Sequence, residues 1–218
     1  RYPVEFAQRL MTSYGLTGGR FVAGLGAGST RADFDAVGVD YEQRFKLFNE
    51  GLPIIKRLLD GETVGTANIH PWPNVEGRPP ILIGSWHSGM WVKKAAREYD
   101  GWQGSGLTSY SALKEGIQRF RDAGGKRAMV CTIGINLKGR REPLGDDERF
   151  RLFCGRDEAV DRLNRLAELG YDDVCVTSAD HTEADITDED LHIIRTLVPV
   201  PSGHAPRIEP SPSGRGLG

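Results

Sequence analysis

The sequence predicts an α/β fold built around a parallel sheet, and three observations support that prediction. Short apolar runs alternate with segments in which apolar residues recur at helical spacing. The apolar runs are continuous, as expected for strands that are buried on both faces. Glycine-rich loops follow two of these runs. Strands that alternate with helices in this way pair in parallel through right-handed crossovers.

From the amino terminus, apolar spacing predicts a helix over residues 4–14, a short strand over 21–25 and a long helix over 45–59. Gly51 and Pro53 should weaken or kink the long helix, because proline removes a backbone hydrogen bond. The first element would begin with a proline in its first turn, which is a favourable position for that residue.

The middle of the chain continues the alternation. Residues 61–80 contain four prolines and three glycines and are predicted to be a loop. A second strand over 81–83, a helix over 90–99 and a third, very short strand over 100–105 follow. Ser109 begins the next predicted helix, which reaches residue 123 and ends at a glycine pair.

The last part of the chain completes five predicted strands. Residues 127–137 and 172–177 read as strands, on either side of a helix over 157–169. The segment 187–197 opens with a pattern that resembles a capping box. The proline- and glycine-rich tail over residues 199–218 is predicted to be disordered.

Composition excludes several classes of protein. The 218 residues carry 28 basic and 30 acidic side chains, so the net charge is −2. This balance disfavours nucleic-acid and anionic-membrane partners. No apolar run approaches the roughly 20 residues of a membrane-spanning helix, and the first residues lack the pattern of a signal peptide. We therefore expect a cytoplasmic protein that binds neither nucleic acid nor membrane.

Three cysteines are widely spaced and odd in number, which argues against a zinc site and a disulfide framework. Cys131 and Cys175 lie within apolar runs. We expect both to be reduced, buried and unreactive.

The loop written G-S-W-H-S-G, residues 84–89, is a candidate phosphate site. Ser88 is expected to cap the following helix, which would leave backbone N–H groups free to bind an anion. Gly84 and Gly89 would let the ligand approach the backbone, and Ser85 and His87 would add donors. A plain strand-to-helix turn explains the same residues, and Trp86 is more often a pocket wall or a core residue than a cofactor stacker.

The loop written G-L-G-A-G-S, residues 24–29, allows fewer conclusions. It fails as a dinucleotide fingerprint, because the third glycine position holds another residue. Its G-x-G-x-G spacing leaves open an S-adenosylmethionine-dependent methyltransferase. No acidic residue follows at the distance needed to bind a ribose.

Three blocks of sequence, spanning roughly residues 3–198, together resemble the luciferase-like monooxygenase family. These are G-R-F-V-A-G-L-G-A-G-S with the long helix after it, R-P-P-I-L-I-G-S-W-H-S-G-M-W-V-K-K-A-A-R-E-Y-D-G-W, and R-D-E-A-V-D-R-L-N-R-L-A-E-L-G-Y-D-D-V-C-V. The resemblance implies a TIM (β/α)8 barrel of the bacterial-luciferase type that uses FMN or the deazaflavin coenzyme F-420.

The resemblance also implies how the chain is organised. The five predicted strands would be strands four to eight, so residues 1–198 would form an N-terminally truncated barrel domain, followed by the tail over 199–218. We expect upstream sequence to supply three more βα units. A homodimer is left open.

Site residues follow from the resemblance by position. Gly84, Ser85, Ser88 and Gly89 would hold the cofactor phosphate. The family's G-G-S-G-P is one residue longer here, which puts the individual contacts in question. Three further residues, in the first loop, would lie beside the cofactor or substrate: Gly26, Ala27 and Gly28.

Residues outside the two loops are expected to have structural or surface positions rather than contacts with the cofactor. Arg44 and Glu50 match family positions where a structural ion-pair role is expected. His70, in the long loop, is expected to lie at the surface. No catalytic residue is predicted, because in this family much of the proton-transfer machinery lies on the first three strands.

The resemblance implies an enzyme, a flavin-dependent oxidoreductase or monooxygenase. Such an enzyme acts on a small organic substrate with reduced flavin and O₂, or exchanges hydride with the deazaflavin. The alternatives are a flavoprotein or inactive fragment that binds the cofactor without turnover and, less favoured, the methyltransferase.

Overall fold

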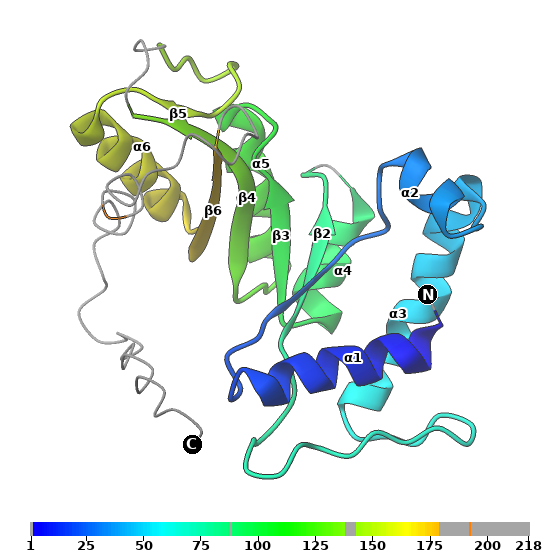
Figure 1. The fold of residues 1–218 in the computed structure, drawn as a ribbon. Coiled ribbons are helices and arrows are strands. Elements are labelled where there is room, and N and C mark those ends of the chain that lie inside the picture. The colour runs from blue at the N-terminus through cyan, green and yellow to red at the C-terminus, as the bar shows by residue number, and fades with distance from the viewer. Residues whose placement is uncertain (1, 88, 138–142, 179–191, 193–218) are drawn as a thin grey trace, which may run out of the picture.

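Six parallel strands form one sheet in the computed structural model, which describes residues 2–87, 89–137, 143–178 and 192 (Figure 1). Neighbouring strands pair in the order β1-β2-β3-β4-β5, and β6 also pairs with β4. The strands are β1 (Ala23–Leu25), β2 (Ile81–Ser85), β3 (Gly101–Ser105), β4 (Ala128–Asn136), β5 (Leu152–Phe153) and β6 (Asp173–Ser178).

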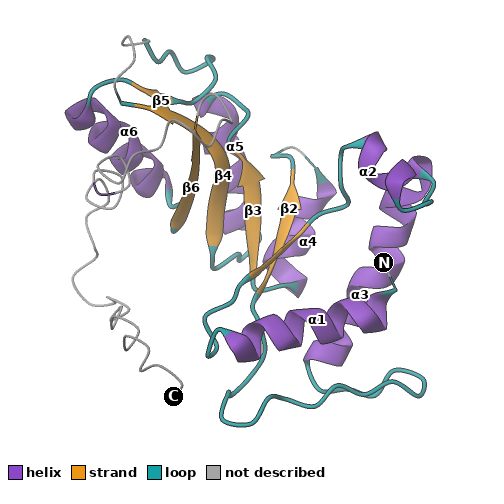
Figure 2. Cartoon of the chain, in the orientation of Figure 1, coloured by secondary structure: helices purple, strands orange, loops and turns teal. Residues whose placement is uncertain are grey.

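Helices α4 and α5 cover one face of this sheet, and α1 and α3 pack together beside β1 and β2 (Figure 2). The helices are α1 (Pro3–Leu16), α2 (Arg31–Ala36), α3 (Arg44–Leu59), α4 (Met90–Glu98), α5 (Tyr110–Asp122) and α6 (Arg156–Leu169), with a short 3-10 helix, η1 (Tyr41–Gln43). No helix in the described part of the chain is long and apolar enough to cross a membrane.

The predicted parallel α/β arrangement is confirmed. All five predicted strands are present, and the loop predicted over residues 61–80 contains only an isolated bridge between Val64 and Ala67. The sequence missed α2 and β5, which are six and two residues long and too short to show a period. Pro53 lies inside α3, which runs through it as one helix. The segments predicted over 187–197 and 199–218 lie outside the described residues, His192 apart.

Local signals place the helix ends close to the predicted positions. The Ser109 hydroxyl accepts a hydrogen bond from the backbone N–H of Ala112 at 3.3 Å, which caps α5. Gly170 ends α6 with a φ of 103°, a left-handed conformation that glycine adopts without steric cost. Pro3 occupies the first turn of α1, where its missing N–H has no helical partner to lose.

The core lies between the sheet and its covering helices, and Trp102 is at its centre. The Trp102 side chain is fully buried on β3 and packs against Phe120 of α5 and Tyr171, at ring-centroid distances of 5.8 and 6.1 Å. Its indole N–H donates a hydrogen bond of 3.1 Å to the Ser85 hydroxyl at the end of β2. Trp102 therefore connects the core directly to the loop after β2.

The prediction that Cys131 and Cys175 are both buried is wrong. Cys131 is half-buried and Cys175 is exposed, whereas Cys154 is the buried cysteine. The reason is the alternation of side chains along β6, in which Val174 and Val176 pack against the core. Cys175 between them points to the opposite face of the sheet, which the helices do not cover.

Candidate active site

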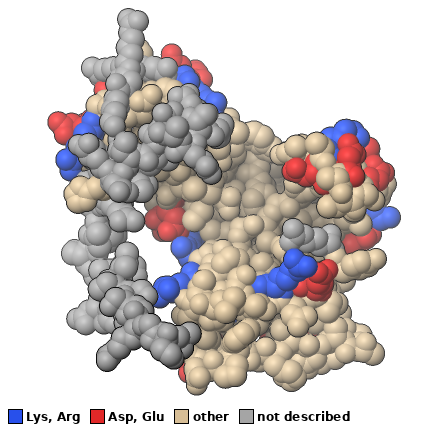
Figure 3. Space-filling model, in the orientation of Figure 1, with Lys and Arg blue, Asp and Glu red and all other residues tan. Residues whose placement is uncertain are grey.

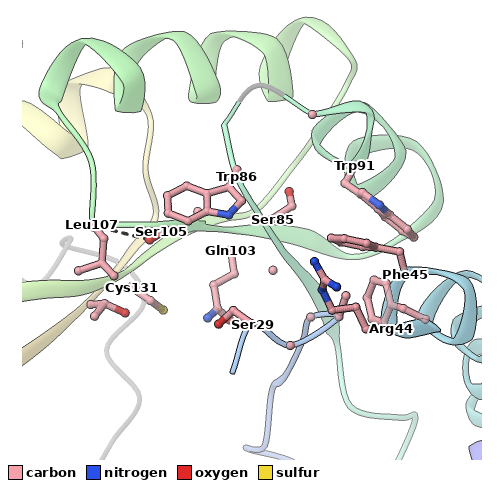
Figure 4. Close-up of a pocket in the computed structure, with 18 of the residues that line it drawn as sticks. Ser29, Arg44, Phe45, Ser85, Trp86, Trp91, Gln103, Ser105, Leu107 and Cys131 are labelled. Carbon is pink, nitrogen blue, oxygen red and sulfur yellow. Dashed lines mark hydrogen bonds between the residues drawn. The ribbon is translucent and has the colours of Figure 1, made fainter. Parts of the chain in front are cut away.

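A cavity of about 620 Å³ lies at the carboxyl ends of β1, β2 and β3. This is the edge at which ligands bind in α/β sheets, and the volume is within the usual range of small-molecule sites. Figure 4 shows Arg44 and Phe45 at one end, Leu107 and Cys131 at the other, and Trp86 and Trp91 on the side of α4.

The structure brings both predicted glycine loops to this one cavity. Gly26 and Gly28 line it from the loop after β1, and Gly84, Ser85 and Gly89 line it from the loop after β2. The two loops touch at their closest point, since a Cβ built on Gly84 would lie 3.7 Å from the Cα of Gly26. The sixth predicted residue, Ser88, lies outside the described residues.

The amino end of α4 differs from the prediction in its cap. The N-cap residue is Gly89, with an extended backbone (φ −88°, ψ 164°) and no side-chain cap. The first turn of α4 contains no acidic residue. The first backbone N–H groups of a helix have no partner within the helix. A negatively charged ligand would therefore meet free donors and no opposing carboxylate at this helix end.

Ser85 reaches the cavity with its hydroxyl already positioned. The hydroxyl oxygen accepts the hydrogen bond from the buried Trp102 indole, so its own proton is free to be donated elsewhere. The cavity includes Ser85 among its lining residues. The buried N–H of Trp102 thus orients the Ser85 hydroxyl, which can donate a hydrogen bond to a ligand in the cavity.

His87 does not contribute a donor to the cavity, contrary to the prediction. Its side chain is 5% exposed and packs edge-on against Trp102 at 5.6 Å, and it is not among the residues that line the cavity. Its Nε2 atom is buried and has no hydrogen-bond partner among the described residues. Burial lowers the pKa of His87, although the neighbouring backbone of Ser105 partly opposes that shift.

We expect His87 to make the stability of the protein depend on pH. Burial lowers its pKa in the folded protein, whereas the unfolded histidine has a pKa of about 6.5. The unfolded chain therefore binds the proton more tightly, and the free energy of unfolding falls as the pH drops below about 6.5. Urea unfolding between pH 5 and 8 should show this slope in the wild type and a shallower one in His87→Gln.

The matched control is His70→Gln, because His70 is an exposed loop histidine, as predicted. That variant should keep the wild-type slope. An unchanged slope in His87→Gln would show that the acid sensitivity arises at other groups.

Arg44 is the one formally charged side chain among the lining residues that the structure describes. Its guanidinium stacks over the Tyr41 ring at 3.8 Å and over the Phe45 ring at 4.4 Å, and its Nη1 donates to the Tyr41 carbonyl at 3.0 Å. The nearest carboxylate, Glu42, is 3.8 Å away and largely exposed.

Of the ion-pair roles predicted for Arg44 and Glu50, the structure shows that of Arg44, whose partner is Glu42. Glu50 is exposed on α3 and forms no ion pair with a described residue. Arg44 is held by aromatic stacking and by a long ion pair with the exposed Glu42, and it lines the cavity. This arrangement favours an anionic ligand.

Apolar and aromatic side chains form much of the rest of the wall. Trp86 is 62% exposed and Phe45 is 51% exposed, which is unusual for side chains of this size. Phe48 packs against Trp91 with ring centroids 5.0 Å apart. Such surfaces suit a flat ring system. Figure 3 shows uncharged residues over much of this face of the molecule, with one group of charged side chains at the upper right and a smaller group below it.

Sequence reasoning missed most of the wall that comes from β3, β4 and the start of α3. The end of the third predicted strand, over residues 100–105, was a usable signal. Residues at the carboxyl end of a parallel strand lie at the same edge of the sheet as the two glycine loops. The stacking of Tyr41 under Arg44 has no sequence signal, since it depends on how η1 meets α3. The missed lining residues are Ser29, Tyr41, Phe45, Phe48, Trp91, Gln103, Gly104, Ser105, Leu107, Cys131 and Thr132.

Comparison with known proteins identifies the family. The family model described as luciferase-like monooxygenase matches residues 1–136. The chain belongs to the luciferase-like monooxygenase family. Uncharacterized protein Rv0940c from Mycobacterium tuberculosis is 25% identical over 185 residues, covering 81% of this chain. This chain spans 57% of the length of that relative.

Solved structures of luciferase-like enzymes share the fold. Monooxygenase RslO1 from Streptomyces bottropensis has a TM-score of 0.65 at 17% identity, over 90% of this chain and 71% of that one. The coenzyme F-420 dependent tetrahydromethanopterin reductase from Methanopyrus kandleri has a TM-score of 0.62 at 16% identity, over 91% and 79%.

A third structure is the oxygenating constituent of 3,6-diketocamphane monooxygenase from Pseudomonas putida, in complex with FMN. It has a TM-score of 0.59 at 14% identity, over 81% of this chain and 69% of that one. These likenesses show the TIM-barrel fold of the family, and the described residues form an open six-stranded part of it.

Proposed function

We propose that this luciferase-like protein binds a phosphate-bearing flavin, either FMN or the deazaflavin coenzyme F-420, and uses it to oxidise or reduce a small organic substrate. The observation that carries the proposal is the positive charge of Arg44 in a cavity that is lined by the two glycine loops and has no carboxylate among its described lining residues. The family match and the cofactors named for two of the structural neighbours support it.

The residues of the cavity fit such a cofactor. Gly26, Gly84 and Gly89 let a ligand approach the backbone, and a Cβ on Gly89 would have no neighbour closer than 3.8 Å, so space is free there. Ser85 and the free N–H groups of α4 would donate to the phosphate, and Arg44 would balance its charge. Trp86 would face the flat ring.

The cofactor, when bound, would supply the transfer of electrons or hydride, and the protein would position it. Ser85 would orient the phosphate end through its bond to Trp102, and Trp86 and Leu107 at the cavity mouth would exclude water. A substrate that fits beside a flat ring between these side chains is apolar and uncharged. The two glycine loops would fix where the reacting ring lies relative to that substrate.

Gly89→Val should weaken the binding of FMN by at least tenfold, or ~1.4 kcal/mol. The added side chain would fill the space at the amino end of α4 and keep the phosphate from the backbone N–H groups. The extended backbone of Gly89 suits valine, so the fold should be unaffected. The measurement is a titration with FMN and with riboflavin, which lacks the phosphate and should lose much less affinity.

A matched control is Gly155→Val. Gly155 is also an extended N-cap glycine with free space around it, but it begins α6, away from the cavity. It should leave both affinities unchanged. Equal losses for FMN and riboflavin in Gly89→Val would mean that the loop shapes the fold rather than binding a phosphate, and no loss for either would place the phosphate at the loop after β1.

Two other functions are tested by the same titration. A flavoprotein without turnover would bind FMN and show no substrate-dependent reoxidation. A methyltransferase would bind S-adenosylmethionine in place of FMN, but none of the structures compared above is a methyltransferase.

A further inference from the structure

Two cysteines face one another on neighbouring strands at one end of the cavity. The register between β4 and β6 shifts between Val130 and Ile133. Two residues of β4, Cys131 and Thr132, therefore lie opposite the single residue Cys175 of β6, which is the arrangement of a β-bulge. Bulges re-aim side chains next to functional sites.

The backbone of the bulge is held in an uncommon conformation. Thr132 has a φ of 65°, in the left-handed region that β-branched residues rarely adopt. Such conformations persist where the surrounding structure holds them, and they cluster at functional sites. Both Cys131 and Thr132 line the cavity. The strained segment is thus part of the cavity wall.

The two cysteines lie opposite one another and differ in exposure. Burial, together with the neighbouring Cys175, raises the pKa of Cys131 to about 12. Cys131 is half-buried and Cys175 is exposed, so a small oxidant in solution meets Cys175 first. Cys154 is buried elsewhere and provides an internal comparison.

We propose that Cys131 and Cys175 form an oxidative modification site, at which a small peroxide converts the two thiols into a reversible intramolecular disulfide. Adjacent strands lie about 4.8 Å apart, within the Cα separation of roughly 4.4–6.8 Å that disulfides span. The site does not depend on which cofactor occupies the cavity.

The chemistry balances with hydrogen peroxide as the oxidant. The Cys175 sulfur attacks one peroxide oxygen, the O–O bond breaks, and a sulfenic acid and water form. The Cys131 sulfur then attacks the Cys175 sulfur, the S–S bond forms, and the S–O bond breaks. The Cys131 proton leaves with the departing hydroxide as a second water. Two thiols and one peroxide give one disulfide and two waters.

The bulge favours the second step, because it leaves one residue of β4 outside the regular ladder. The disulfide would join β4 to β6 beside the cavity and remove the Cys131 thiol from its wall.

The test is to treat the protein with hydrogen peroxide and map its cysteines by mass spectrometry under non-reducing conditions. We expect the number of free thiols to fall from three to one, with a mass loss of about 2 Da. The peptides that contain Cys131 and Cys175 should be crosslinked, Cys154 should stay reduced, and dithiothreitol should restore all the thiols.

Serine variants supply the controls. Cys154→Ser should form the same crosslink, whereas Cys175→Ser should form none. Phenylarsine oxide, which binds two adjacent thiols, should bind the wild type at one equivalent and should not bind Cys175→Ser. The binding to the wild type is a second test that requires no variant. A crosslink that includes Cys154, or oxidation of Cys175 to sulfinic acid with Cys131 still free, would overturn the proposal.

Discussion

Trp102→Ala should lower the free energy of unfolding by ~3–5 kcal/mol, the usual cost of removing a large buried aromatic side chain. The indole is fully buried between β3 and α5 and contacts the rings of His87, Phe120 and Tyr171. No neighbour can fill the space without breaking its own packing. Chemical denaturation followed by circular dichroism measures the loss.

Trp72→Ala is the matched control, because Trp72 is 40% exposed in the long loop before β2. It should cost much less. Trp102→Phe keeps part of the packing and removes the N–H that binds Ser85. It should fall between the other two variants in stability while still weakening FMN binding. A Trp102→Ala loss no larger than that of Trp72→Ala would show that the cavity left in the core collapses freely.

Arg44→Gln should reduce the affinity for FMN by roughly 10- to 100-fold, since a hydrogen bond to a charged group contributes about 1.5–3 kcal/mol. Glutamine keeps a polar, shorter side chain and removes the charge. Riboflavin has no phosphate, so its affinity should change little. The loss should also shrink as salt is added, because added ions screen the charge that the wild type uses.

Arg31→Gln is a close control for this variant. Arg31 also stacks on the Tyr41 ring, at 4.6 Å, but it does not line the cavity and pairs with Glu42. It should leave the FMN affinity unchanged. If Arg44→Gln and Arg31→Gln weakened FMN equally, the aromatic stack would matter and the charge in the cavity would not.

The Arg44 result bears on the proposed function as a whole. Loss of FMN affinity with riboflavin affinity kept would identify Arg44 as the partner of the phosphate. Loss of both would mean that Arg44 holds the wall of the cavity. Either result can be read together with Gly89→Val. Because both residues are proposed to act on the same phosphate, we expect the two losses to be coupled rather than additive.

The sequence by itself determined the class of fold and the two loops that matter. Continuous apolar runs such as residues 81–83 are typical of strands buried on both faces, and that pattern indicates a parallel sheet. Gly84 and Gly26 were found because small residues after a buried strand have few other uses. Both signals depend only on neighbouring residues in the sequence, so they can be recognised without knowledge of the tertiary structure.

Only the tertiary structure decided which way individual side chains point. Cys175 was predicted to be buried and is exposed, because side chains alternate along β6. His87 was predicted to be a donor in the site and is buried, because it packs against Trp102. Arg44 is held beside the cavity by the ring of Tyr41, which η1 places against its guanidinium. The bulge that brings Cys131 opposite Cys175 follows from the register between β4 and β6. Registers and ring contacts join residues far apart in the chain, and spacing along the chain carries no information about them.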